Sequence, residues 1–372
     1  MKKLLLSTAL AGVVLSTSAI AQTTVGGNMT VGLRATEEKG VAGVTSVASK
    51  RGMLIETQLN VANKGALNNG MSYAAGFSLE FDANDHVSAT STKSIANENV
   101  YIDLISGNTT FSAGIDHMND FDRSMIPVVG EIGKGTGSQG GTSAVTNMLA
   151  DPLNTSAAAG VAVRQAFPGV GQLTLAYSPT MTCNSTDIQG CGGADTTVTE
   201  GAEGSGYSAL LEISNVGIKG LALEAGYTEQ QKKVGSTSSS NKDATFLTAG
   251  LRYTNGPITA GYNRKEFSYG GATTASELTS TTKLAGGYTI NEERTQNDFG
   301  VSYTVGNLSY GAVYQITDSN IATELDEKYK GIGIGYNLGP VAAKANFGKH
   351  SNLGGVNGTD ADILTVKLST NF

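Results

Sequence analysis

The strict alternation of apolar and polar residues at the end of the chain is the feature that most restricts its fold. In the segment 361–372, one face of an extended strand carries Leu364, Val366, Leu368 and Phe372, and the other carries Thr365, Lys367, Ser369 and Asn371. Successive side chains of a β-strand point to opposite faces, so this period of two predicts a strand. Terminal segments commonly fray unless they are held in place. We therefore expect pairing with another strand to hold this one.

The same alternation recurs along most of the chain. It predicts strands at 23–35, 51–62, 71–82, 97–105, 109–117, 160–167, 171–179, 205–214, 219–229, 244–254, 257–268, 295–305, 308–317, 328–338, 340–349 and 361–372. Sixteen is an even number within the range of bacterial outer-membrane β-barrels.

The connections between these segments alternate between short and long. The short turns are 106–108, 168–171, 255–257, 306–307 and 339–340, and they are rich in the Gly and Asn residues that accept a positive φ. The long connections are 37–50, 118–159, 180–204, 230–243, 269–294 and 350–360. A barrel in the outer membrane has short turns at its periplasmic rim and long loops at its extracellular rim.

The composition agrees with a wall that is apolar on one side only. Charged residues make up 15% of the chain and hydrophobic residues 39%, and both values lie below those of typical soluble domains. No apolar run after residue 21 reaches the ~18 residues that indicate a transmembrane helix. The formal charge of −7 makes nucleic acid an improbable partner. We therefore predict an all-β fold, a closed antiparallel transmembrane β-barrel of about 16 strands.

Residues 1–21 have the pattern of a secretory signal peptide. Lys2 and Lys3 precede an apolar core, and Ala19-Ile20-Ala21 gives the small-residue cleavage pattern. The expected mature chain is a single domain over 22–372. Its formal charge is −9, because removing the two lysines lowers −7 by two.

Aromatic residues recur near the outward ends of the predicted strands, as interfacial girdles require. They are Phe77, Phe81, Phe111, Tyr177, Tyr253, Tyr288, Tyr303 and Tyr336. The alternative is a soluble β-sandwich with these rings in its core. That fold would leave the polar face of every strand exposed to solvent.

With these features, the chain resembles the general, trimeric porins of Gram-negative bacteria, in particular the alphaproteobacterial type. The resemblance depends on the signal peptide, the opening strand TTVGGNMTVGLRAT, the long connection after the fifth strand and the closing strand that ends in Phe372. It covers the mature chain as a pattern and contains no single diagnostic motif. It implies an outer-membrane location, a homotrimer, and a third loop, here 118–160, that folds into the lumen. Lipid, lipopolysaccharide, and small solutes and ions are the implied partners.

The predicted constriction has two charged sides. Acidic residues in or beside the long loop are Asp116, Asp120, Asp122, Glu131 and Asp151, and basic residues assigned to the pore wall are Arg34, Arg51, Arg164, Lys344 and Lys367. The first, fifteenth and sixteenth strands become neighbours when the sheet closes, so Arg34, Lys344 and Lys367 should lie together. Further inward acids are Glu56, Glu80, Asp103, Glu212 and Glu224. Opposed charges of this kind set ion preference. For any single residue, the alternative is a solvated wall position without special effect.

Cys183 and Cys191 are the only two cysteines, and both lie in a polar loop. In an oxidising compartment such a pair indicates a disulfide. The spacing does not match the CxxC motif of redox catalysis.

The sequence contains no HExxH, GxSxG or phosphate-loop motif, so we predict no enzyme activity. We predict no cofactor; the acidic loop residues Asp318, Glu324, Asp326 and Glu327 are the one candidate Ca²⁺ site, with plain solvation as the alternative. The predicted function is passive diffusion of small hydrophilic solutes. The alternatives are a substrate-specific channel, which needs an aromatic path along the lumen, and a secreted β-rich adhesin, which needs an internal repeat.

Overall fold

The computed structural model describes residues 21–39, 48–82, 95–115, 125–132, 159–178, 205–214, 217–230, 244–268, 293–320, 324–352 and 357–372. Within these ranges the chain forms sixteen strands and one short 3₁₀ turn, η1 (Val129–Glu131). The strands are β1 (Gln22–Lys39), β2 (Ala48–Ala66), β3 (Ser72–Asp82), β4 (Ile95–Ser106), β5 (Thr109–Ile115), β6 (Ala159–Phe167), β7 (Gly171–Ser178), β8 (Gly206–Ser214), β9 (Leu221–Gln230), β10 (Ala244–Asn255), β11 (Ile258–Ser268), β12 (Glu293–Val305), β13 (Leu308–Ser319), β14 (Glu327–Asn337), β15 (Val341–Ser351) and β16 (Asp360–Asn371).

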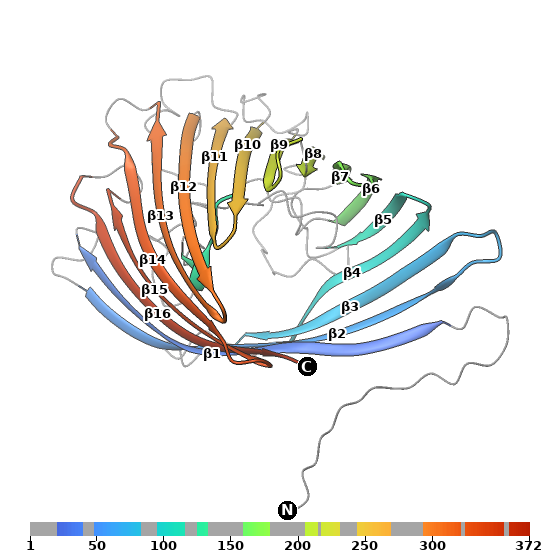
Figure 1. The fold of residues 1–372 in the computed structure, drawn as a ribbon, viewed down its shortest axis with the longest axis horizontal. Coiled ribbons are helices and arrows are strands. Elements are labelled where there is room, and N and C mark those ends of the chain that lie inside the picture. Colours follow the sequence, from blue (N-terminus) through green and yellow to red (C-terminus); the bar gives the residue numbers. More distant parts are fainter. Residues whose placement is uncertain are drawn as a thin grey trace, which may run out of the picture.

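The strands form one closed antiparallel barrel, in which each pairs with its neighbours in sequence and β16 pairs with β1 (Figure 1). Phe372 takes part in this closure. Its backbone N–H donates to the carbonyl oxygen of Gly27 at 3.0 Å, and the N–H of Gly27 donates to the carbonyl oxygen of Phe372 at 2.9 Å. The predicted barrel, its strand number and the closing role of Phe372 are confirmed.

The predicted alternation of faces is also confirmed. In β16, Leu364 is 47% exposed and Leu368 is 53% exposed, whereas Thr365 between them is 2% exposed. The outer wall is therefore apolar and the inner wall polar, as a membrane-spanning barrel requires. The outward aromatics Phe77, Phe111, Tyr177, Tyr253, Tyr303 and Tyr336 are all exposed. Tyr288 and the side chain of Phe81 lie outside the described residues.

The two ends of the barrel differ, as predicted. Tight turns join β4 to β5, β6 to β7, β10 to β11, β12 to β13 and β14 to β15, and their glycines Gly107, Gly169, Gly256, Gly306 and Gly339 have positive φ. We call this rim the turn end and the opposite rim the loop end. Within the described residues, no helix is long and apolar enough to cross a membrane.

Strands β1 and β2 are longer than the sequence predicted. Their pairing continues to Glu38 opposite Ala48, beyond the predicted limits of 23–35 and 51–62. Strands pair through backbone hydrogen bonds, which do not depend on the side chains. The pairing of β1 with β2 therefore extends beyond the residues whose side chains alternate between apolar and polar.

Candidate pore-lining site

A segment from the connection between β5 and β6, residues 125–132, lies against the polar face of strands β10 to β15. At one end, the backbone N–H of Met125 donates to Oδ1 of Asn263 in β11 at 2.7 Å. At the other end, Nδ2 of Asn346 in β15 donates to the carbonyl oxygen of Gly130 at 2.6 Å. We call 125–132 the wall segment. Its two anchors are side chains of the inner face, four strands apart.

Glycines on the inner face let the wall segment come this close. A Cβ at Gly261 would overlap the carbonyl oxygen of Met125, and a Cβ at Gly333 would overlap that of Val129. Both are backbone atoms of the wall segment and cannot yield as a flexible side chain would. Glycine at an interior strand position is typical of sites where another backbone approaches. Gly331, Gly333 and Gly335 share one face of β14, and the contact with Val129 requires glycine at Gly333.

Apolar side chains near both ends of the wall segment also hold it. Ile126 and Ile132 are 2% and 0% exposed and form one cluster with Val313 of β13 and Tyr329 of β14. Burying a side chain of this size contributes roughly 1.5–3 kcal/mol. The segment is thus held by two hydrogen bonds and a small apolar core of its own.

Several predicted residues lie outside the described residues. Asp116, Asp120, Asp122 and Asp151 are among them, as are Cys183 and Cys191 and the signal peptide up to residue 20. Glu131 belongs to η1, but its side chain is not described. Of the predicted constriction loop 118–160, the structure describes only 125–132 and the first residues of β6.

The predicted basic group is brought together at the closure of the barrel. Lys344 of β15 lies directly opposite Lys367 of β16, and Lys367 lies opposite Gly32 of β1. Nε of Arg34 donates to Oγ1 of Thr365 at 3.4 Å, which places Arg34 on the same polar face. We call Arg34, Lys344 and Lys367 the basic group.

Arg51 does not belong to this group, and its predicted position on the pore wall is wrong. It lies opposite Ala35, the neighbour of Arg34, so it falls on the other face of the sheet. Arg51 is an even number of residues from Met53 and Leu59, so its side chain lies on the same face of β2. Both of those residues are exposed on the apolar outer wall. This even spacing could have been read from the sequence.

Arg164 faces inward as predicted, but on a different part of the wall. Its Nη1 lies 3.8 Å from Oδ1 of Asp103 in β4 and hydrogen-bonds to Oγ of Ser112 in β5, which donates to the same carboxylate oxygen. Arg164 and the predicted inward acid Asp103 therefore form a local ion pair away from the basic group.

Two further predicted acids lie side by side across the barrel from the basic group. Glu212 of β8 lies directly opposite Glu224 of β9, and Glu224 is 4% exposed. In a ring of sixteen strands, β9 is the strand farthest round from β1. The basic group and this pair of glutamates thus occupy opposite sectors of the inner wall.

The sequence analysis missed a buried polar network on the inner face of β11 to β13. Asp298 and Lys265 are both 0% exposed. Oδ1 of Asp298 accepts hydrogen bonds from Nε2 of Gln296 at 2.7 Å and Nε2 of Gln315 at 2.9 Å. Along β12 and β13 these polar residues alternate with outward aromatics such as Phe299 and Tyr314. That alternation in the sequence could have shown that their side chains face inward.

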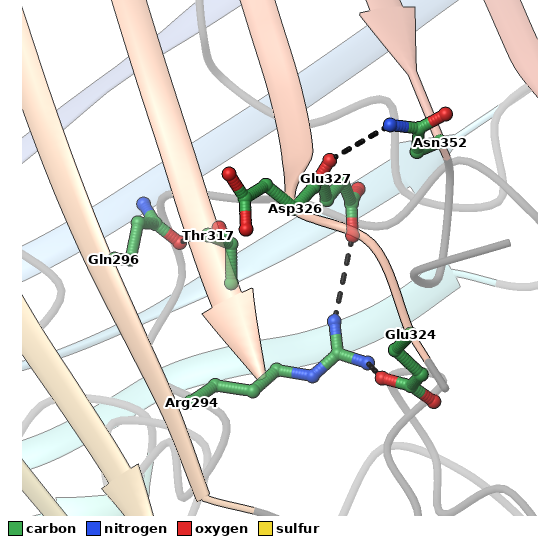
Figure 2. Close-up of polar contacts among 7 residues, drawn as sticks. All are labelled: Arg294, Gln296, Thr317, Glu324, Asp326, Glu327 and Asn352. Atoms are coloured by element: carbon green, nitrogen blue, oxygen red, sulfur yellow. Dashed lines mark hydrogen bonds and ion pairs between the residues drawn. The ribbon is translucent and has the colours of Figure 1, made fainter. Parts of the chain in front are cut away.

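At the loop end of the same strands, one arginine holds two carboxylates (Figure 2). Nη2 of Arg294 lies 3.1 Å from Oε2 of Glu324, and Nη1 lies 3.5 Å from Oε2 of Glu327. Asp326 lies 3.8 Å from Nζ of Lys328. Three of the four acids considered for Ca²⁺ are therefore paired with cations. Among the described residues, no group of three potential metal ligands is found.

The comparisons with known proteins agree with this geometry. A family model described as Gram-negative porin matches residues 7–295. A triple mutant of the Rhodopseudomonas blastica porin superposes with a TM-score of 0.52 at 17% identity, covering 94% of this chain and all of that one. An anion-selective porin from Comamonas acidovorans gives a TM-score of 0.59 at 12% identity, covering 95% and 100%.

At such identities the structural likeness supports the fold alone. No curated protein sequence matches the chain. The family match covers well over half of the sequence, and the closed sixteen-strand barrel with its apolar outer wall agrees with it. The chain therefore belongs to the Gram-negative porin family and is a transmembrane β-barrel of the outer membrane.

Proposed function

We propose that this porin is a passive, water-filled channel for small hydrophilic solutes and ions. The observation that carries the proposal is the wall segment, which is fixed by Asn263 and Asn346 across the polar inner face of a closed barrel. A segment held there takes up part of the lumen cross-section while the rest of the wall stays polar. Family and fold indicate a channel rather than an enzyme.

The proposal extends to the rest of the connection 118–160. Glu131 lies within the wall segment, Asp120 and Asp122 come shortly before it, and Asp116 and Asp151 are farther along the chain on either side. We propose that these acids and the basic group together line the narrowest part of the lumen. Opposed rings of charge would favour polar over apolar solutes and set ion preference.

A homotrimer in a lipid and lipopolysaccharide bilayer is part of the proposal. Strands β4 to β8 lie next to one another in the barrel. Their outer face carries an apolar hollow of about 570 Å³, lined by residues such as Phe111, Val163 and Leu175. A second copy of the chain is a better cover for a hollowed apolar wall than lipid.

A substrate-specific channel is less well supported. It needs aromatic side chains that solutes can slide along. Three of the inward rings, Phe246, Phe267 and Tyr329, are 1%, 2% and 4% exposed, and Tyr101 on β4 is partly buried. Phe246 and Phe267 pack against each other with ring centroids 5.0 Å apart. They serve as packing at the loop end.

Reconstitution tests the proposed function. Folded protein purified from membranes and added to a planar lipid bilayer in KCl should give discrete, long-lived conductance steps. The conductance should rise in proportion to salt concentration, as expected for a water-filled pore. Protein that migrates as a folded, heat-sensitive species on gels but gives no conductance would overturn the proposal.

A further inference from the structure

The outer wall carries two lysines side by side near its loop end. Lys330 of β14 lies directly opposite Lys349 of β15, and both side chains are exposed. Each lies two residues along its strand from an apolar residue that is exposed on the outer wall, Ile332 on β14 and Phe347 on β15. Since residues two apart share one face of a strand, both lysines belong to the outer face. We call Lys330 and Lys349 the lysine pair.

The lysine pair marks the point where the apolar band of the outer wall ends. On β14, Ile334 and Ile332 are exposed on the outer wall, and Lys330 is the next outward residue toward the loop end. On β15, Phe347 is the last outward apolar residue before Lys349. The apolar band of a transmembrane barrel faces the acyl chains of the lipids, and long loops are extracellular in such barrels. The lysine pair therefore lies beside the headgroups of the outer leaflet.

The ammonium groups of the lysine pair are open to a partner. Nζ of Lys330 lies 5.6 Å from the centroid of the Tyr314 ring on β13, a distance at which a cation and an aromatic face attract each other. Among the described residues, no carboxylate forms an ion pair with either lysine, although Asp362 of β16 lies opposite Lys349 on the side away from Lys330. Like charges directly opposite each other in a sheet are destabilising. An anion held between the two lysines would remove this repulsion.

We propose that the lysine pair binds the phosphate group of an outer-leaflet lipid, with one acyl chain of that lipid lying on Ile332 and Phe347. The oxygens of a phosphate accept charge-assisted hydrogen bonds from more than one cation, and lysine is a common phosphate ligand. Directly opposite residues on adjacent strands are about 5 Å apart, within reach of two long side chains and one phosphate. The inference deepens the bilayer part of the proposed function, on which it rests, by naming the chemistry of one lipid contact.

Phosphatidic acid and diacylglycerol with identical acyl chains are matched probes, since they differ only in the phosphate group. Each is titrated into the folded porin in detergent, and native mass spectrometry counts the bound lipids. Phosphatidic acid should fill a saturable first site, and diacylglycerol should bind there about a hundredfold more weakly, as expected for the loss of two hydrogen bonds to charged groups. Equal binding of the two lipids would overturn the proposal. Displacement of phosphatidic acid by equimolar inorganic phosphate would also overturn it, because the free ion rather than the lipid would then be the ligand.

Charge variants locate the phosphate. Lys330→Gln and Lys349→Gln should each raise the dissociation constant for phosphatidic acid about tenfold, the usual worth of one hydrogen bond to a charged group. Lys328→Gln removes the same charge from the same face of β14, but Nζ of Lys328 already lies 3.8 Å from Oδ2 of Asp326, so the effect should be smaller. Lys219→Gln, in the turn between β8 and β9, should have no effect. Equal shifts from Lys328→Gln and Lys349→Gln would indicate a general positive field and overturn the site.

A second kind of variant tests the acyl chain. Ile332→Ser and Phe347→Ser together remove apolar surface on the turn-end side of the lysine pair without changing charge. The double variant, checked for folding by its heat-sensitive migration on gels, should bind phosphatidic acid several-fold more weakly and still prefer it over diacylglycerol. Unchanged affinity for phosphatidic acid would overturn the proposal. If this variant does not fold, the lysine variants decide the question alone.

Lipid binding and conductance are separate measurements, so the lipid site and the channel can fail separately. A porin that conducts but does not prefer phosphatidic acid over diacylglycerol would overturn only the lipid site. A folded porin that binds phosphatidic acid through the lysine pair but gives no conductance would overturn only the channel.

Discussion

Asn346 donates a hydrogen bond from its side-chain amide to the carbonyl oxygen of Gly130, a residue 216 positions earlier in the chain. Gly130 has a positive φ of 65°, and a Cβ there would lie 2.5 Å from the carbonyl oxygen of Ala345. The conformation and the close contact both require glycine. This hydrogen bond and the close contact together fix the wall segment against β15.

Removing both anchors should release the wall segment. In the double variant Asn263→Ala and Asn346→Ala, each lost bond leaves a backbone group unpaired, at a cost of about 1–3 kcal/mol per group. We expect larger single-channel conductance with more open-channel noise. Asn63→Ala, at a part-buried bond to Tyr73 on the other face of the sheet, is the control and should conduct like the unmodified protein. Unchanged conductance in the double variant would remove the wall segment from the constriction.

Filling the contact at Gly333 should displace the wall segment by a different route. Gly333→Val places a side chain where the carbonyl group of Val129 lies. The barrel ladder does not depend on this contact, so the protein should still fold and should show raised conductance and faster protease cleavage near residue 129. Gly52→Val is the matched control, because no atom lies within 4 Å of a Cβ built at Gly52. A similar change in both variants would contradict the explanation.

The loop acids should set ion preference. Replacing Asp120 and Asp122 with Asn, and Glu131 with Gln, removes two negative charges just before the wall segment and one within it. The zero-current potential across a bilayer in a KCl gradient should then move toward anion selectivity. Glu229→Gln is the control, since Glu229 lies on the outer face and accepts a bond from Tyr227. An unchanged potential in the triple variant would place those acids outside the ion path.

The Arg294 cluster should contribute strongly to stability. Arg294→Met leaves Glu327, which is 3% exposed, as a buried carboxylate without its cation, and breaking such a pair costs roughly 3–5 kcal/mol. Adding Glu327→Gln should recover much of that loss in a double-mutant cycle. Arg264→Met breaks an exposed pair with Glu266 and should change the free energy of unfolding by at most about 1 kcal/mol. Equal destabilisation by Arg294→Met and Arg264→Met would argue against the buried pair.

The faces of the strands could be predicted because a period of two is a local property. Successive residues along one strand face opposite sides, so Leu364 can be placed outside and Thr365 inside without knowing which strands pair with it. Arg51 was assigned to the pore wall because of its charge. Its spacing of two residues from Met53 would have placed it on the outer face, which the two residues share. The basic group could be predicted as well, because closure makes the first and last strands neighbours.

The contacts of the wall segment could not be predicted in the same way. Asn263 and Asn346 have no feature in the sequence that separates them from other inward amides, and only the path of a distant segment gives them a role. Such arrangements follow from register and packing between segments far apart in the chain.

The pairing of β1 with β16 has a consequence for assembly. Arg34 and Thr365, which contact each other across this seam, are 331 residues apart, and contacts of such long range form slowly. Until they form, the first and last strands each present a row of unpaired backbone groups to any other chain nearby. A partly built sheet of this porin would therefore be prone to aggregate in the periplasm.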